Sequence, residues 1–144
     1  MMDLQAAIGI HQLKRVDEWL KRRNEIWQMY QSAFINLPVE LPPDDEPNTV
    51  HARHLYTLMV DKEKAGINRD DFMQELHLKN IGTGVHYLGV HLHPYYQDTY
   101  GYKPSDFPNA TWFSERTVSL PLSAKLSNQD VEDIISAIHD VIPS

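Results

Sequence analysis

The segment Thr117-Val-Ser-Leu-Pro-Leu122, followed closely by Leu126-Ser-Asn-Gln-Asp-Val131, decides the fold of this chain. The first part predicts a strand over residues 117–122. The second part places a serine three residues before an aspartate, which predicts a helix cap at Ser127. The helix that follows has an apolar face, made of Val131, Ile134, Ile135, Ile138 and Ile142. A strand that leads into an amphipathic helix indicates a sheet covered by helices.

Two further strands are expected upstream of this segment. His54-Leu-Tyr-Thr-Leu-Met-Val-Asp61 is rich in residues that favour strands, and residues 83–88 resemble a second such run. Asn68 predicts the cap of a helix that lies between them, and Gly82 is expected to end that helix. Shorter helices are predicted over residues 93–100 and 110–116, separated by a loop over residues 104–108.

The first third of the chain predicts one long helix of about 30 residues. Asp3 is its expected cap and Pro38 its expected end. Apolar residues recur at three- and four-residue steps, with one interruption by charged residues between Leu20 and Trp27; they are Ala6, Ile10, Leu13, Val16, Leu20, Trp27, Tyr30, Phe34 and Leu37. Residues 38–53 hold four of the nine prolines and predict a loop.

Together these elements predict an α+β fold in a single domain over residues 1–144. We expect a small, mostly antiparallel sheet of about three strands, with helices packed on one face and a long N-terminal helix. A parallel βαβ arrangement is the alternative, but no glycine-rich turn from strand to helix supports a nucleotide-binding fold.

Composition narrows the functional classes. The formal charge of -7 argues against a nucleic-acid-binding surface. The chain has no cysteine, which excludes disulfides, thiolate metal sites and cysteine nucleophiles, and which fits a cytoplasmic protein. No apolar run approaches the roughly 20 residues that span a bilayer, and the N-terminus does not resemble a secretory signal, so no membrane association is expected.

The chemistry-bearing residues gather in Val85-His-Tyr-Leu-Gly-Val-His-Leu-His-Pro-Tyr-Tyr96, which contains three histidines and three tyrosines. Three imidazoles can hold zinc, but no carboxylate lies between Val85 and Gln97, and each histidine can equally be a hydrogen-bonded or solvated loop residue. Ser119 lacks the glycine-flanked turn of a serine nucleophile. All seven lysines lie in charged or loop contexts. The residues therefore predict no complete active site: no catalytic, cofactor-binding or metal-binding residue.

In their order along the chain, several segments resemble the pyridoxal-phosphate-dependent sugar aminotransferases of the DegT/StrS type. The resemblance covers nearly the whole chain and rests on Met2–Leu13 with Arg22-Arg23-Asn24, His54-Leu-Tyr56, Ile81-Gly-Thr-Gly-Val-His-Tyr87, His91 with Pro94 and Tyr96, Phe107-Pro108, Ser114-Glu-Arg116, Ser119-Leu-Pro-Leu122, and Leu126-Ser127 with Asp130-Val131. Gly89 is a departure, because the family often has proline there.

The resemblance implies a function. The family transfers an amino group, usually from glutamate, to the ketone of a nucleotide-linked keto sugar, and a lysine holds the pyridoxal phosphate. The family works as homodimers in amino-sugar and polysaccharide biosynthesis. Its cofactor lysine and most phosphate contacts lie in a large domain upstream of the matched segments. We therefore expect this chain to be the C-terminal small domain without the large cofactor-binding domain, to bind no pyridoxal phosphate alone, and to be inactive alone.

By the same resemblance, His86, Tyr87 and His91 are expected to border the substrate pocket of a complete enzyme, as hydrogen-bonding groups. Leu4, Ile8 and Leu13 either pack locally or form a surface for the missing large domain. The alternative function is a stand-alone module that binds nucleotide sugars or proteins without catalysis.

Overall fold

A two-stranded sheet lies at the centre of the fold. The computed structural model describes residues 1–142 of the chain. Strands β1 (Tyr56–Met59) and β2 (Thr117–Leu120) pair antiparallel, with Tyr56 opposite Leu120 and Met59 opposite Thr117. Both strands lie within the segments predicted to form them, and the α+β class is confirmed.

The third predicted strand, over residues 83–88, is wrong. Only Gly84 pairs with the sheet: its N–H donates to the carbonyl of Ser119 at 3.1 Å, and the N–H of Ser119 donates back at 2.7 Å. A second isolated bridge joins Glu40 to Met59 on the other edge of the sheet. On each edge of the sheet, a single bridging residue therefore pairs with part of the strand that would otherwise be exposed.

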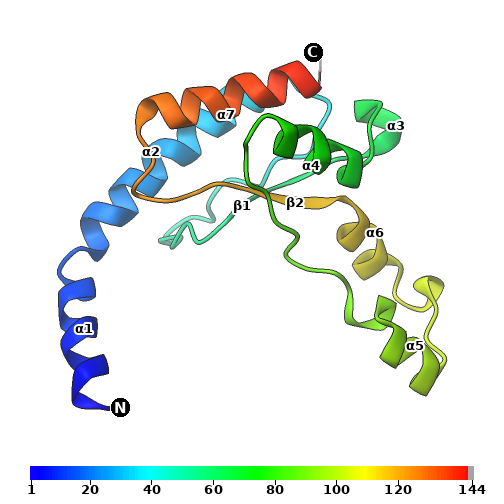
Figure 1. The fold of residues 1–144 in the computed structure, drawn as a ribbon, viewed down its shortest axis with the longest axis horizontal. Coiled ribbons are helices and arrows are strands. Elements are labelled where there is room, and N and C mark those ends of the chain that lie inside the picture. The colour runs from blue at the N-terminus through cyan, green and yellow to red at the C-terminus, as the bar shows by residue number, and fades with distance from the viewer. Residues whose placement is uncertain (143–144) are drawn as a thin grey trace.

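Three helices form a layer above the sheet in Figure 1. They are α2 (Val16–Phe34), α4 (Arg69–Leu78) and α7 (Asn128–Val141), and α7 contacts both of the others. The predicted cap residues are confirmed: Asn68 Oδ1 accepts from the N–H of Asp71 at 2.9 Å, and Ser127 Oγ accepts from the N–H of Asp130 at 3.1 Å. A single extra turn, α3 (Lys62–Ala65), follows β1.

Aromatic rings fill the core between this layer and the sheet. Tyr30 and Phe34 of α2 are fully buried, and the ring of Tyr56 from β1 lies 5.0 Å from that of Tyr30 in an edge-on arrangement. The hydroxyl of Tyr30 donates to the carbonyl of Pro121 at 2.9 Å, so its polar end is satisfied inside the core.

The predicted long N-terminal helix is divided into two. Helix α1 (Asp3–Leu13) ends two residues before α2 begins, and the N–H of Arg15 bonds to the carbonyl of Gln12, three residues back. No residue of α1 is buried, so nothing among the described residues holds its axis in line with α2. The cap is Met2 and not Asp3, and α2 ends at Phe34, before Pro38.

Helix α4 ends at Leu78, earlier than the predicted end at Gly82. Asn80 adopts a left-handed conformation (φ 63°), and the N–H of Ile81 donates to the carbonyl of Leu76 at 2.9 Å. This is the usual geometry of a helix C-terminus, with asparagine in the position that glycine often takes.

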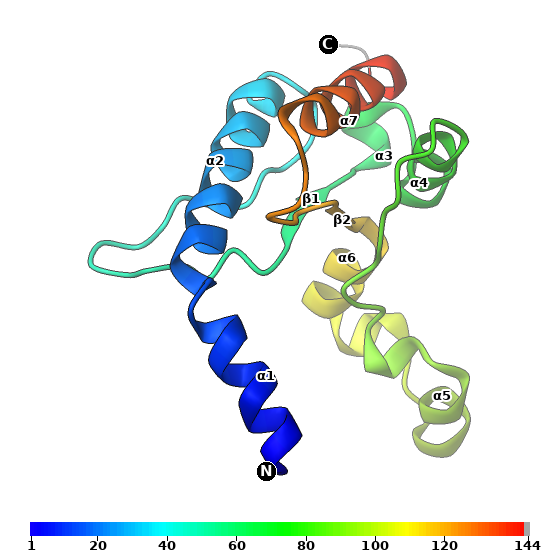
Figure 2. The same cartoon turned by 60° about the vertical axis from the view of Figure 1, so that its left-hand side comes forward.

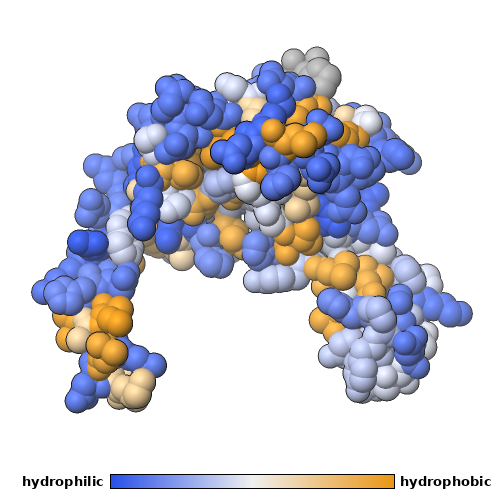
Figure 3. Space-filling model, viewed as in Figure 1, coloured by the Kyte–Doolittle hydropathy of each residue, from blue (hydrophilic) through white to orange (hydrophobic). Residues whose placement is uncertain are grey.

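Two limbs project from the same side of the central layer (Figures 1 and 2). One is α1. The other contains α5 (Pro94–Tyr100), which ends at left-handed Gly101, and α6 (Pro108–Arg116), which leads into β2. The space-filling view shows an open gap between the limbs, with apolar side chains gathered on α1 (Figure 3). Among the described residues, no helix combines the length and apolarity needed to cross a membrane.

Candidate functional site

The segment from Gly84 to His93 connects the edge of the sheet to the limb formed by α5 and α6 (Figure 1). It begins at the Gly84–Ser119 bridge on the edge of β2 and ends at His93, which precedes α5. The three residues predicted to border a substrate pocket all lie on it, but their environments differ.

His86 is partly buried and held by β2. Its Nδ1 lies 2.9 Å from the Oγ of Ser119, a residue that is buried in the strand. A Cβ on Gly84 would lie 3.0 Å from Cε1 of the same ring, so the glycine lets the imidazole approach the backbone closely. One ring nitrogen is therefore engaged by the fold, and Nε2 is the one left to meet a ligand.

Tyr87 is the most exposed of the three residues. Its side chain is 70% exposed, and its ring lies 4.8 Å from that of His86 in an edge-on arrangement. The two rings form an adjacent pair at the surface, with one nitrogen and one hydroxyl that can donate hydrogen bonds.

His91 is buried instead. Its Nε2 lies 2.8 Å from the Oγ1 of Thr111, and that hydroxyl donates to the carbonyl of Pro104 at 2.8 Å. Because a threonine hydroxyl has one proton, His91 must be the donor in the first bond, which fixes the proton on Nε2. The ring connects the start of the limb to α6.

Gly89 makes this position of His91 possible. A Cβ on Gly89 would lie only 2.7 Å from Cε1 of the His91 ring. Its φ of -58° would suit the proline that the family often has, but its N–H donates to the Oγ of Ser114 at 2.7 Å. A proline would lose that bond.

Sequence reasoning missed the hydroxyls that hold this segment. Ser119, Ser114 and Thr111 bind His86, the backbone of Gly89 and His91, respectively. The only signal in the sequence is that the two serines lie in or just before the strand predicted over residues 117–122, where a small polar side chain needs an internal partner.

An aromatic cavity of about 620 Å³ opens on the limb beside His91. The rings of Tyr96, Tyr100 and Tyr102 stack in sequence at its wall, with successive centroids 6.0 and 5.5 Å apart, and Phe107 closes it.

The limb is anchored at its base, where Arg116 donates to Asp61 at 2.8 Å. That hydrogen bond lowers the pKa of Asp61 below its ordinary value.

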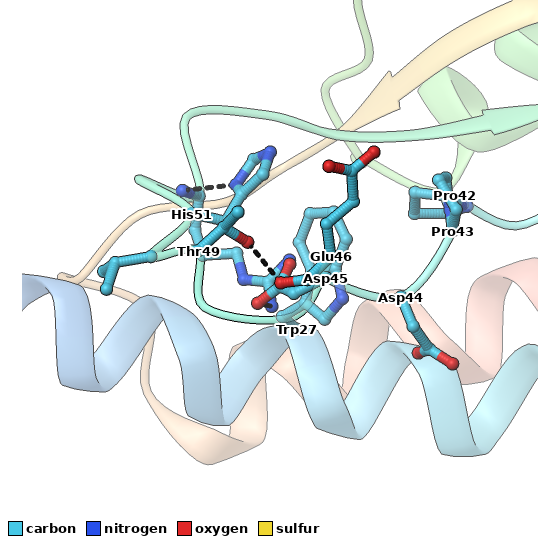
Figure 4. A pocket seen from close by; sticks show the side chains of 10 residues that line it. Trp27, Pro42, Pro43, Asp44, Asp45, Glu46, Thr49 and His51 are labelled. Atoms are coloured by element: carbon cyan, nitrogen blue, oxygen red, sulfur yellow. Dashed lines mark hydrogen bonds and ion pairs between the residues drawn. The ribbon is translucent and has the colours of Figure 1, made fainter.

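A second cavity, of about 360 Å³, lies between α2 and the proline-rich loop (Figure 4). Its base is Arg53, which is 5% exposed and has a left-handed backbone (φ 48°). The guanidinium lies 4.1 Å from the ring centroid of Trp27 and donates to Asn24 at 2.9 Å and to Asp45 at 2.7 Å. These partners satisfy the charge, so Arg53 fixes the loop to α2.

The residues present do not make a pyridoxal phosphate site. All seven lysines are exposed, so none has the desolvated setting that activates an amine for a Schiff base. Within residues 1–142, no three carboxylate or imidazole groups are arranged to hold a metal ion. The polar groups left free on this segment, at His86 and Tyr87, can form hydrogen bonds to a ligand.

Comparison with known sequences gives the family of the chain. A sequence model of the DegT/DnrJ/EryC1/StrS aminotransferase family matches residues 1–139. The spore coat polysaccharide biosynthesis protein SpsC of Bacillus subtilis is 50% identical over 143 residues, and an uncharacterized protein of Methanocaldococcus jannaschii is 45% identical over 142 residues. The matches cover 99% of this chain but 37% of each relative, so the chain spans just over a third of their length.

Solved structures agree with this assignment. The PLP form of Spr1654 from Streptococcus pneumoniae superposes with a TM-score of 0.87 at 31% identity, over 98% of this chain and 36% of that one. The aminotransferase TlmJ from Streptoalloteichus hindustanus gives a TM-score of 0.81 at 29% identity, over 94% and 35% of the two chains. From the fold and from the match along nearly all of its length, we conclude that this chain belongs to the DegT/DnrJ/EryC1/StrS aminotransferase family.

Proposed function

We propose that this chain is the C-terminal small domain of a pyridoxal-phosphate-dependent aminotransferase that acts on a nucleotide-linked keto sugar. The observation that carries the proposal is the family match over residues 1–139, which covers only 37% of the relatives' length. On this proposal the remaining part, a large domain, supplies the lysine and the cofactor, and the chain alone is inactive. The reaction serves amino-sugar or polysaccharide biosynthesis.

The exposed apolar side chains of α1 support the idea of a missing partner domain. Leu4, Ile8 and Leu13 are 70%, 54% and 72% exposed, although they belong to one helix of a small protein. Apolar side chains on a projecting helix favour association with another surface. We propose that the large domain, in a homodimeric enzyme, covers them.

In the complete enzyme, His86 and Tyr87 border the sugar-nucleotide pocket. Their role is to orient the substrate by hydrogen bonding, with glutamate as the amino donor of the reaction. His91 lines the aromatic cavity and contributes less directly, because its Nε2 is already bound to Thr111. The chain has no cysteine, and we place the activity in the cytoplasm.

A chimera tests the assignment of the pocket residues. The segment of pneumococcal Spr1654 that matches this chain is replaced by residues 1–144, and amino transfer from glutamate to nucleotide-linked keto sugars is followed. We expect His86→Ala to raise KM for the sugar about five- to tenfold, the value of one net hydrogen bond, with little change in kcat.

The matched control is Tyr95→Phe, at an exposed tyrosine on α5 outside the His86–Tyr87 pair. It should leave KM unchanged. A His86→Ala chimera with the KM of its parent would contradict the role of His86, while Tyr87→Phe tests the second residue in the same way.

A binding module without catalysis is the second candidate function. The observation in its favour is a core of 17 buried apolar residues, drawn mainly from the two strands and from three helices. Such a core indicates a domain able to fold alone. Calorimetry of the isolated chain with nucleotide sugars separates the two: specific heat of binding favours the module, and no heat favours the aminotransferase domain.

A further inference from the structure

We propose that Ser119 is a positioning residue that fixes the orientation and the tautomer of His86, so that Nε2–H is presented as a hydrogen-bond donor. The inference deepens the proposed function, on which it rests, because it names the atom that meets the substrate and the kind of substrate group that this atom can bind.

The orientation follows from contacts on two sides of the ring. The Oγ of Ser119 lies 2.9 Å from Nδ1, and Gly84 lies so close that a Cβ there would approach Cε1 to 3.0 Å. Ser119 and Gly84 are themselves joined by two backbone hydrogen bonds of 3.1 and 2.7 Å. The strand, the bridge and the imidazole therefore form one unit, and the ring cannot turn without losing its bond to β2.

The tautomer follows from the hydrogen-bonding capacity of a buried hydroxyl. Ser119 is 4% exposed, and among the described residues Nδ1 of His86 is the one hydrogen-bond partner of its Oγ. If Nδ1 carried the proton, the serine would accept and its own O–H would be left buried without an acceptor, which is unfavourable. The hydroxyl therefore donates to Nδ1, and the proton of the neutral ring resides on Nε2.

This arrangement selects the substrate group. A protonated Nε2 can only donate, whether the ring is neutral or charged, because a charged ring has protons on both nitrogens. The group opposite His86 must therefore be an oxygen acceptor, such as a sugar hydroxyl, a carbonyl or a phosphate oxygen. Tyr87, with its ring 4.8 Å away, lies on the same exposed side to supply a second polar contact.

The test uses the 144-residue chain itself, labelled with ¹⁵N in its histidines. The ring nitrogens of His86 are assigned by comparison with His86→Gln and recorded near pH 8, where an ordinary imidazole of pKa about 6.5 is neutral. We expect an unprotonated Nδ1 and a protonated Nε2. In Ser119→Ala the two shifts should move toward each other, because both tautomers become populated, and Ser119→Thr should restore the separation.

The control is Ser136→Ala on the exposed side of α7, which should leave the His86 shifts unchanged. A protonated Nδ1 in the unmutated chain overturns the proposal without any variant. Unchanged shifts in a folded Ser119→Ala chain, judged by its backbone spectrum, overturn it as well.

Activity separates this inference from the function on which it rests. In the Spr1654 chimera, Ser119→Ala should raise KM for the sugar nucleotide about twofold, because about half of the His86 rings would then present Nε2 without its proton. A shifted tautomer with unchanged KM would mean that Ser119 orients a ring that does not touch substrate. That result would contradict the role of His86 and leave the positioning by Ser119 intact.

Discussion

Replacing Gly89 with alanine should break the hydrogen bond between His91 and Thr111. The new Cβ would lie 2.7 Å from Cε1 and 3.0 Å from Nδ1 of His91. Relief of this contact to an ordinary carbon separation requires a movement of roughly 1 Å. Such a movement extends the 2.8 Å bond to Thr111 beyond hydrogen-bond distance, because the ring is buried and Thr111 is itself bound to Pro104.

The expected cost is about 1–3 kcal/mol, the penalty for a buried donor left without a partner. It is measured by urea unfolding, as a lower midpoint at unchanged m. Hydrogen exchange reports local opening, so the amides of α5 and α6 are followed as well, and these amides should lose protection.

Gly82→Ala is the matched control. A Cβ at Gly82 meets nothing within 4 Å, so this change should be neutral or should stabilise the chain by up to about 1 kcal/mol. Equal stabilities for the two alanine variants, with the limb amides still protected, would refute the argument that Gly89 is needed for the packing of His91.

Three further outcomes are expected. Arg53→Met should lower the free energy of unfolding by about 2 kcal/mol in urea, because it removes charge-assisted bonds to Asn24 and Asp45; a stability change below about 0.5 kcal/mol would contradict this. Ile8→Ser should change the stability of the isolated chain by less than about 0.5 kcal/mol, since no residue of α1 is buried, yet it should weaken assembly of the chimera on size-exclusion chromatography. Burial raises the pKa of Tyr30, so above about pH 10 the unfolded state releases its proton first and stability should fall as the pH rises; Tyr30→Phe should reduce this slope, and an unchanged slope would count against it.

The features that the sequence predicted well are local ones. The caps at Asn68 and Ser127 involve side chains and N–H groups three residues apart, and the helix predicted over residues 93–100 ends where left-handed Gly101 follows α5. Such interactions are complete within one turn of helix, so they can be predicted without the rest of the fold.

The errors arose where the outcome depends on distant partners. Residues 83–88 have the composition of a strand, but only Gly84 finds a pairing partner, and the chain then leaves the sheet to bring His86 against Ser119. Likewise, the apolar pattern passes from Leu13 to Val16 without a break, but α1 packs against none of the described residues and the helix is interrupted near Arg15.

The candidate site was predictable in part. The sequence singled out His86, Tyr87 and His91, but it could not distinguish the exposed Tyr87 from the buried His91, because their burial depends on α6 and β2. The roles of the three residues in binding substrate remain predictions.

The proposed function is tested most directly by the absorbance of the cofactor after the chain is joined to a large domain. Residues 1–144 are substituted for the matching segment of Spr1654, whose PLP and PMP forms are both known, and the absorbance of the purified chimera is recorded before and after addition of glutamate. We predict that the chimera retains pyridoxal phosphate and converts it to the amino form, whereas the isolated chain binds none. A folded chimera that holds no cofactor, or whose cofactor does not respond to glutamate, would contradict the assignment of this chain as an aminotransferase domain.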